Sequence, residues 1–310
     1  MKVFMNRQPV EGPWGGGNRT LITIVERLKL RKHEVTFDIN DKFDVIYCND
    51  PRPDNRGLRY EHLLYFKNSK QIPIFQRVGD VFYHRGPENT EYLKESLKYS
   101  DKISFITDWA ADFLEVKIDN KKTYVHELRP PRIFFKEKEK QIKGNDIRIM
   151  THHWSNNSLK GVDEYNEIGN LLKKEKYRNV KFFYMGRPSA KLNKSLISVI
   201  PPHETESVIK ELDKSDIYVT ASKFETGGNH VVEAIARNLP VIYHELGGGI
   251  NSICRSNKDV LKFDCIERFE QILDNLLQSG CKNNIKFNNC LEDVCDQYIE
   301  IMESLCNYQQ

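Results

Sequence analysis

Two carboxylates and a pair of glycines stand close together in one stretch of the chain. Seven residues separate Glu225 from Glu233, and Gly227 and Gly228 lie between them. Backbone amides at a glycine-rich helix start can hold a phosphate, and carboxylates beside them can accept hydrogen bonds from hydroxyl groups. The pattern therefore predicts a site for a phosphorylated ligand rich in hydroxyls. Glu233 alone would be weak evidence, because a Glu near a helix start also stabilises the helix.

The segment 215–252 that contains these residues predicts strand, loop, helix, strand and loop. Residues 216–221 form an apolar, β-branched run that is typical of a buried parallel strand. A helix is expected over residues 229–238, and a proline soon after it favours its end there. The next strand is expected at 241–243, followed by a loop with three consecutive glycines at 247–249.

This segment resembles the E-x7-E signature of the retaining, nucleotide-sugar-dependent glycosyltransferases of family 4 (group 1). The resemblance rests on the spacing of Glu225 and Glu233 and on the sequence EAIARNLPVIYHELGGG, which begins at Glu233. It implies an α/β protein of the GT-B fold, with two Rossmann-like domains whose parallel sheets face a central cleft. It also implies that Glu225, with Thr226 and Gly227, contacts the donor sugar, and that Glu233 binds the ribose hydroxyls.

A lysine in the second half adds to the site that the resemblance implies. Lys160 follows a predicted strand, and a glycine and a helix come after it. In the resembled family a lysine here contacts the donor diphosphate, where its charge would stabilise the departing nucleotide. The family usually also has an arginine about five residues earlier, where this chain has Ser155. Arg187, His152 or His153 could take over that role.

Backbone amides are predicted to complete the diphosphate site. In the second half these belong to Gly228 and Asn229. A strand over residues 2–5 and a helix capped by Asn18 are expected near the N-terminus, with a glycine-rich turn between them. Backbone often approaches a phosphate at such a turn, although the spacing is not the G-x-G-x-x-G of dinucleotide sites. The resemblance implies that this turn faces the diphosphate, and its residues are Gly15, Gly16 and Gly17.

Strands and helices alternate through the first half, which predicts a parallel sheet with right-handed crossovers. The strands are expected at residues 35–38, 44–48, 72–76, 103–106 and 123–126. Ligands of such sheets gather at the carboxyl ends of strands, where Asp80 is a candidate catalytic residue. Charged residues near these ends could equally cap helices, but we expect three of them to contact the acceptor or line the cleft: Asp50, Arg52 and Arg77.

A proline pair followed by a Lys/Glu run indicates a connection between two domains. We expect a Rossmann-like acceptor-side domain over residues 1–138 and a nucleotide-sugar-binding domain over 139–290. The last segment, 291–310, has an apolar helical stripe. In GT-B enzymes such a terminal helix often crosses back to the first domain.

The bulk composition fits a globular, cytoplasmic protein. Of the 310 residues, 39% are hydrophobic and 29% are charged, and the net charge of +3 is too small to indicate nucleic acid. No apolar run approaches the roughly 20 residues of a membrane span, and the N-terminus lacks a signal-peptide core. The seven cysteines include no C-x-x-C pair, which favours free thiols over a zinc site.

No cofactor and no essential metal are expected. His152 and His153 are neighbours on a predicted strand, so their side chains would point to opposite faces and would not share an ion. The chain also lacks an Asp-x-Asp signature. Positive charge from Lys160 and from backbone amides could do what a divalent ion does elsewhere.

The resemblance implies a retaining hexosyl- or pentosyltransferase that uses a UDP- or GDP-linked sugar. The acceptor would be a hydroxyl of a glycan, a lipid or a protein, and front-face substitution would be assisted by the leaving diphosphate. Three alternatives stay open. They are an epimerase or phosphorolytic enzyme of the same fold, a non-catalytic nucleotide-sugar-binding subunit, which Ser155 favours, and a peripheral membrane protein that uses GLRYEHLLYFKNSK.

Overall fold

The chain forms two compact units, each built on a six-stranded sheet. The first unit contains residues 1–128 and 289–310, and the second contains residues 129–288. The predicted boundary at 138–139 lies outside the described residues, and the chain leaves the first unit between Leu128 and Arg129. The computed structural model describes residues 1–12, 14–53, 57–135, 146–255, 261–279, 283 and 285–307.

The sheet of the first unit is parallel throughout, in the order β2-β1-β3-β4-β5-β6. Its strands are short apolar runs with side chains buried on both faces, as a covered parallel sheet requires. Chain order reverses between β1 and β3, which are neighbours in the sheet. The strands are β1 (Lys2–Met5), β2 (Glu34–Thr36), β3 (Val45–Cys48), β4 (Ile74–Val78), β5 (Lys102–Phe105) and β6 (Thr123–Val125).

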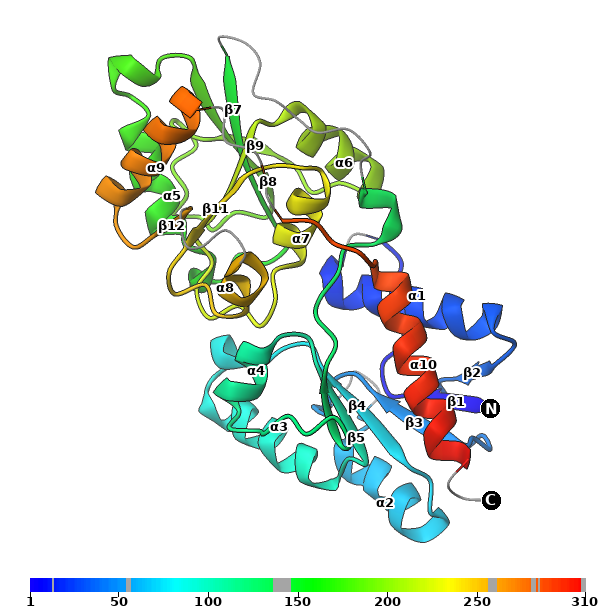
Figure 1. Ribbon diagram of the computed structural model, residues 1–310. Helices are drawn as coiled ribbons and strands as arrows, with labels where there is room; N and C mark the ends of the chain where they lie inside the picture. The colour runs from blue at the N-terminus through cyan, green and yellow to red at the C-terminus, as the bar shows by residue number, and fades with distance from the viewer. Residues whose placement is uncertain are drawn as a thin grey trace. The chain divides into compact units, whose positions relative to one another are not determined.

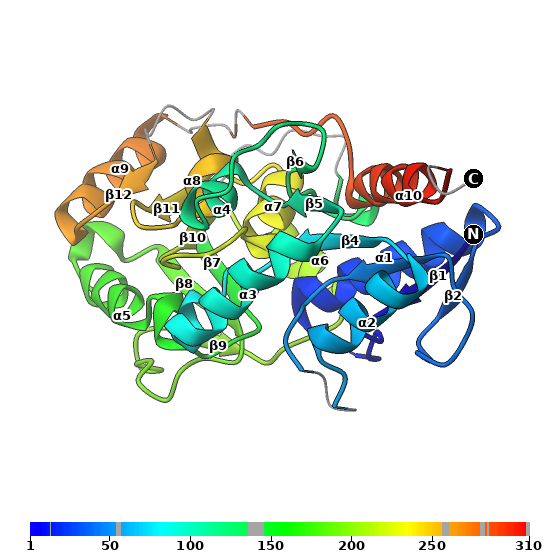
Figure 2. The same cartoon turned by 90° about the horizontal axis from the view of Figure 1, so that it is seen from below.

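Helices cover both faces of this sheet (Figure 1). Val3 and Met5 pack with α1 (Gly15–Leu30) and α10 (Leu291–Asn307) on one face, while Phe4 points to the other. The helices α2 (Tyr60–Lys70) and α3 (Pro87–Tyr99) lie on that other face (Figure 2), and the Tyr60 hydroxyl donates to the Ser96 carbonyl at 2.8 Å. The helices of that face are α2 (Tyr60–Lys70), α3 (Pro87–Tyr99) and α4 (Asp108–Phe113).

The last helix of the chain packs on the first one. Arg27 of α1 donates through Nε to Asp296 of α10 at 3.0 Å, and this bond raises the pKa of the arginine. Tyr298 of α10 is fully buried, with its ring 5.5 Å from that of Phe75 in β4. The C-terminal helix therefore belongs to the core of the first unit.

The start of α1 corrects two expectations. The helix begins at Gly15, so the three glycines form its first turn instead of a connecting turn. Trp14, not Asn18, occupies the cap position. Asn18 lies inside the helix, where its side chain accepts from the Val10 amide at 2.8 Å and donates to the Val10 carbonyl at 2.7 Å. It thereby ties the preceding loop to the helix.

The helix α2 contains most of the segment GLRYEHLLYFKNSK, which was considered for membrane contact. Only Tyr60 and Leu63 of α2 are buried, and Tyr65 is exposed. Across the part of the chain that the structure describes, every helix is too short or too polar to span a bilayer.

The sheet of the second unit is also parallel throughout, in the order β12-β11-β10-β7-β8-β9. Chain order reverses between β7 and β10, which lie side by side. In open α/β sheets, ligands bind beyond the carboxyl ends of the strands at such a reversal. The strands are β7 (Ile147–His153), β8 (Val180–Gly186), β9 (Ser198–Ile200), β10 (Ile217–Thr220), β11 (Val241–His244) and β12 (Lys262–Phe263).

Helices also flank this second sheet. The helix α7 packs on β7 and β11, and α5 lies beside α9 (Figure 1). A loop was expected at residues 247–252, but Gly249 begins a short helix, which corrects that prediction. The helices are α5 (Val162–Leu171), α6 (Thr205–Lys214), α7 (Asn229–Ala236), α8 (Gly249–Cys254) and α9 (Ile266–Ser279). Single 3-10 turns lie at Tyr83–Arg85, Arg132–Phe134, Ser158–Lys160 and Glu175–Tyr177.

Candidate functional site

The carboxyl ends of β7 and β10 bring predicted site residues together. Lys160 donates from Nζ to Oε2 of Glu225, and these side chains are 15% and 25% exposed. Gly161 follows the lysine with a φ of +77°, and a Cβ there would lie 2.3 Å from the carbonyl oxygen of Ala221, just after β10. Only glycine allows this approach, so Gly161 is a geometric requirement of the turn that carries Lys160.

The loop after β10 is tied to the glycine segment after β11. Glu225 forms an isolated parallel bridge with Gly248, and its carbonyl accepts from the Gly249 amide at 2.7 Å. Thr226, Gly227 and Gly228 follow as a buried run that leads directly into α7. The residues predicted to contact a sugar therefore form one continuous segment with a fixed backbone.

The helix α7 starts at Asn229, with Gly228 at its cap position. The first amides of a helix have no acceptor within the helix, so they can bind an anion. A Cβ on Gly228 would lie 3.0 Å from Ile250 and from Val231, so glycine allows close packing here. The geometry agrees with the predicted phosphate role of these amides, which stays a prediction.

Glu233 lies one turn inside α7 and is only 3% exposed. Its Oε2 is 3.0 Å from Nε2 of His152 at the end of β7. On the other side of this ring, Nδ1 is 3.0 Å from the hydroxyl of Tyr218 in β10. Sequence reasoning considered His152 for the diphosphate and, with His153, for a metal ion. It missed the contact with Glu233, because 81 residues separate the partners.

His153 and His230 are buried beside the ring of His152. His153 Nε2 is 2.6 Å from the Tyr165 hydroxyl, His230 Nε2 is 3.0 Å from Thr220 Oγ1, and the two imidazole centroids are 4.7 Å apart. Burial lowers the pKa of both histidines well below its ordinary value, so both stay neutral. Across the described ranges, no group of three or more His, Cys, Asp or Glu is placed to hold a metal ion.

Acid should weaken the fold through these two histidines. Their folded pKa values are depressed, so below about pH 6.5 the unfolded chain binds more protons and the free energy of unfolding falls. We expect a loss of about 1 kcal/mol per histidine between pH 6.5 and 5.5, measured by urea unfolding. His230→Asn should flatten this dependence, whereas the exposed His203→Asn should not. Equal slopes in all three proteins would contradict the assignment.

Arg187 lies beside the loop that follows β7. Its guanidinium is 4.1 Å from the ring centre of Trp154, and its amide donates to the His153 carbonyl at 3.2 Å. Ser155, which stands where the family usually has arginine, accepts from the Asn157 side chain at 3.1 Å. The guanidinium of Arg187 is thus a cation beside this loop, and its contact with a diphosphate stays a prediction.

The predicted charged residues of the first unit fall into two places. Arg52 donates to Asp50 at 2.7 Å and lies 3.9 Å above the ring of Phe82, whose amide donates to Asp80 at 2.8 Å. These three charged residues therefore share one loop cluster after β3 and β4. Arg77 differs, because it is only 4% exposed. It is buried beside Tyr47 and Tyr298 and donates to Asn49 Oδ1 at 3.3 Å.

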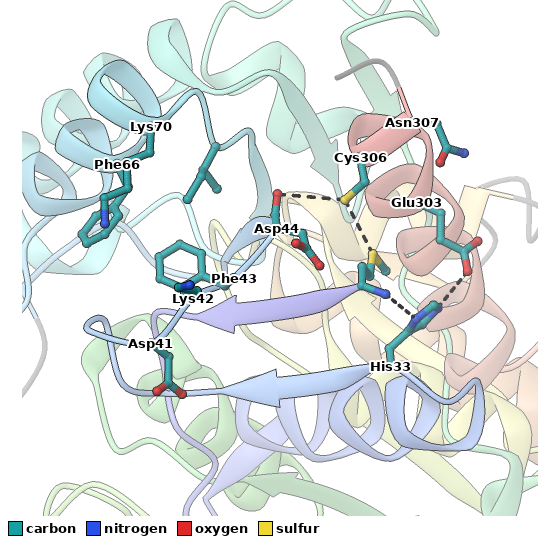
Figure 3. A pocket seen from close by; sticks show the side chains of 12 residues that line it. His33, Asp41, Lys42, Phe43, Asp44, Phe66, Lys70, Glu303, Cys306 and Asn307 are labelled. Atoms are coloured by element: carbon teal, nitrogen blue, oxygen red, sulfur yellow. Dashed lines mark hydrogen bonds and ion pairs between the residues drawn. The ribbon is translucent and has the colours of Figure 1, made fainter. Parts of the chain in front are cut away.

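A pocket of about 870 Å³ in the first unit lies elsewhere (Figure 3). In it His33 links the N-terminal amine of Met1, at 3.3 Å, to Glu303, at 2.8 Å. The pocket adjoins the amino ends of the strands, opposite to the end where open α/β sheets bind ligands. None of the predicted site residues lines it: its lining is Met1, His33, Asp41, Lys42, Phe43, Asp44, Phe66, Lys70, Ile72, Glu303, Cys306 and Asn307.

Comparison with known proteins gives a family match that lies within the second unit. Residues 153–279 match the family of group 1 glycosyl transferases. This matched region contains Lys160, Glu225 and Glu233, and it supports the predicted group 1 resemblance. A search of the curated proteins found no match.

Solved structures of low sequence identity share the fold. WaaG, a glycosyltransferase involved in lipopolysaccharide biosynthesis, is 15% identical with a TM-score of 0.62, covering 100% of this chain and 98% of its own. Sucrose-phosphate synthase from Thermosynechococcus elongatus is 10% identical with a TM-score of 0.65, and the match covers 99% of this chain and 96% of the synthase. S. aureus MnaA, solved with UDP, is 13% identical with a TM-score of 0.54, and the match covers 96% of this chain and 77% of MnaA. The predicted GT-B fold class is therefore confirmed.

Proposed function

We propose that this protein is a retaining glycosyltransferase that moves a sugar from a nucleotide sugar to a hydroxyl group of an acceptor. The observation that carries the proposal is the placement of Lys160, Glu225 and Glu233. All three lie within the match to group 1 glycosyl transferases. Lys160 and Glu225 follow the carboxyl ends of β7 and β10, where the chain order of the sheet reverses, and Glu233 of α7 faces His152 at the end of β7. That is where an open α/β sheet binds ligands.

Each of these residues has a separate role in the proposal. Glu233 accepts hydrogen bonds from the ribose, and Glu225, with Thr226 and Gly227, accepts from the sugar. Lys160 and the first amides of α7 hold the diphosphate. Charge grows on the leaving phosphate as the glycosidic bond breaks, so a cation and amide donors placed there bind the transition state more tightly than the ground state.

The reaction we propose is front-face substitution. The bond between the sugar and the diphosphate breaks, the acceptor oxygen attacks the same face of the sugar, and the leaving phosphate takes the proton of the acceptor hydroxyl. Lys160 and backbone amides supply the positive field, so we propose that no metal is essential. For the acceptor, a glycan, lipid or protein hydroxyl, we propose contacts with Asp50 and Arg52, and Asp80 as a catalytic residue.

A donor screen tests the proposal. Wild-type protein and Glu233→Ala would be melted with UDP, GDP, ADP and their sugars; UDP comes first because the MnaA structure contains it. A nucleotide at 100 times its dissociation constant should add about 2.7 kcal/mol of stability to the wild type. Glu233→Ala should bind roughly 10- to 100-fold more weakly, because hydrogen bonds to a charged group are worth about 1.5–3 kcal/mol.

Glu206→Ala is the matched control, since Glu206 is an exposed glutamate in the first turn of α6. It should respond to nucleotides like the wild type. If no nucleotide stabilises the wild type at millimolar concentration, the proposal fails. Binding without transfer to any of several acceptors would favour a non-catalytic nucleotide-sugar-binding subunit.

A further inference from the structure

His152 has a fixed place between two neighbouring elements of the second unit. It is the penultimate residue of β7, and its side chain is 13% exposed. Its Nε2 faces Oε2 of Glu233 on α7 at 3.0 Å, and its Nδ1 faces the Tyr218 hydroxyl on β10 at 3.0 Å. The imidazole therefore connects a strand to the carboxylate that the proposed function assigns to the ribose.

The hydrogen bonds determine which ring nitrogen carries the proton. An ionised carboxylate only accepts, so the Nε2 atom that faces Glu233 must carry hydrogen. The Nδ1 atom of a neutral ring then accepts, and the Tyr218 hydroxyl donates to it. Tyr218 is suited to this role, because burial raises its pKa well above the ordinary value and keeps its hydroxyl protonated. The backbone amide of His152 also donates to the same hydroxyl, at 3.0 Å, which holds the tyrosine oxygen in place.

We propose that His152 is a positioning residue: together with Tyr218 it holds the Glu233 carboxylate in the orientation that binds the neighbouring 2′- and 3′-hydroxyls of a ribose. This inference rests on the proposed function. A carboxylate has two oxygens and about four acceptor positions, so the bond from His152 to Oε2 restrains its rotation while occupying one of those positions. Loss of that bond would remove this restraint on the orientation of the carboxylate.

Nucleotide specificity follows from this arrangement. A site built to pair with a hydroxyl rejects an analogue that lacks it, because a buried polar group is then left unpaired. Glu233 is buried, so the penalty applies to its carboxylate. The protein should therefore prefer ribonucleotides over 2′-deoxyribonucleotides, and His152 should be needed for that preference.

A purely structural role predicts a different result. The His152 ring also packs edge-on against Tyr218, with ring centres 5.5 Å apart, and against His230, at 6.1 Å. Loss of this packing alone would weaken the binding of every nucleotide by the same factor. The ratio of two affinities therefore separates the two roles, whereas a single affinity does not.

Calorimetric titration of the full chain with UDP, GDP, ADP and their 2′-deoxy counterparts tests the proposal. For whichever base binds, the wild type should prefer the ribonucleotide by roughly tenfold or more. His152→Ala should reduce this ratio to about threefold or less, and His152→Gln, whose side-chain amide can still donate to Glu233, should restore most of it. The exposed His203→Ala should leave the ratio unchanged.

Tyr218→Phe gives a second test that does not depend on His152→Ala folding well. It keeps the ring and removes only the hydroxyl, so Nδ1 loses its donor and the ring can exchange its proton between the two nitrogens. We expect an intermediate ratio, and ¹⁵N spectra of the His152 ring should show protonated Nε2 in the wild type and a mixture in the variant.

The outcomes separate the inference from the proposed function. If wild-type protein binds none of these nucleotides, the proposed function fails and the role of His152 fails with it. If it binds with a clear ribose preference that His152→Ala and Tyr218→Phe leave unchanged, the proposed function stands and the positioning role is overturned. A wild-type spectrum with protonated Nδ1 and unprotonated Nε2 would overturn it as well.

Discussion

Lys160→Met is expected to lower kcat about 100- to 1,000-fold, which is the usual loss when one preorganised donor to a developing negative charge is removed. Lys160 is mostly buried against Glu225, so its ammonium acts in a region with little water to screen it. Methionine keeps most of the apolar stem and removes only the charge. Initial rates with the nucleotide sugar found in the donor screen would give kcat and KM separately, and the loss should appear mainly in kcat.

Lys223→Met is the matched control for this substitution. Lys223 lies in the loop after β10 that contains Glu225, and it also forms a part-buried ion pair, with Glu164, but the proposed function gives it no contact with the donor. We expect its kcat to stay within about threefold of the wild type, since a part-exposed ion pair contributes little. A kcat for Lys160→Met close to that of Lys223→Met would refute the role proposed for Lys160.

Gly161→Ala is expected to destabilise the protein by about 3 kcal/mol or more. The φ of +77° alone costs about 1–2 kcal/mol for a residue with a Cβ. In addition, the new Cβ would lie 2.3 Å from the oxygen and 2.4 Å from the Cβ of Ala221, so the backbone at the end of β10 would have to move. Urea unfolding would show the loss as a lower transition midpoint. Because Lys160 precedes this glycine, nucleotide binding should weaken together with stability.

Gly17→Ala controls for the glycine-to-alanine exchange itself. Gly17 lies in the first turn of α1, its φ is not in the left-handed region, and a Cβ there would meet nothing within 4 Å. Alanine is the better helix former by about 1 kcal/mol, so the midpoint should stay or rise. If Gly161→Ala unfolds at the same midpoint as Gly17→Ala, the close approach to Ala221 does not constrain the native state.

Local sequence was sufficient to predict most of the elements. The apolar run before the loop of Glu225 is β10, and the helix expected from residue 229 is α7. Such elements can be predicted because the pattern of apolar residues over a short segment differs between a strand and a helix of 3.6 residues per turn. The spacing of Glu225 and Glu233 was enough to mark the candidate site. The α/β fold with parallel sheets also followed from the alternation of strands and helices.

Local helix propensity gave the wrong start for α1, where contacts with the preceding loop oppose it. Glycine is a poor helix former, so a turn was the natural prediction for residues 15–17. The helix nevertheless starts there, and the two hydrogen bonds between Asn18 and Val10 fix the loop that leads into it. The surroundings of Arg77 could not be predicted locally either, and its contact with the acceptor or the cleft stays a prediction. A charged residue at a strand end suggests a ligand contact, but the pleat points this side chain at Tyr298, which comes from the far end of the chain.

The sequence by itself determined where most of the strands and helices lie, and it supplied the residue types of the predicted donor site. Only the tertiary structure decided which side chains meet. Lys160 meets Glu225 across 65 residues and His152 meets Glu233 across 81, because β7 and β10 are neighbours in the sheet. The order of strands in a sheet depends on how the whole unit buries both faces of the sheet. The free energy of that burial comes from contacts between distant segments, so no short segment of sequence determines it.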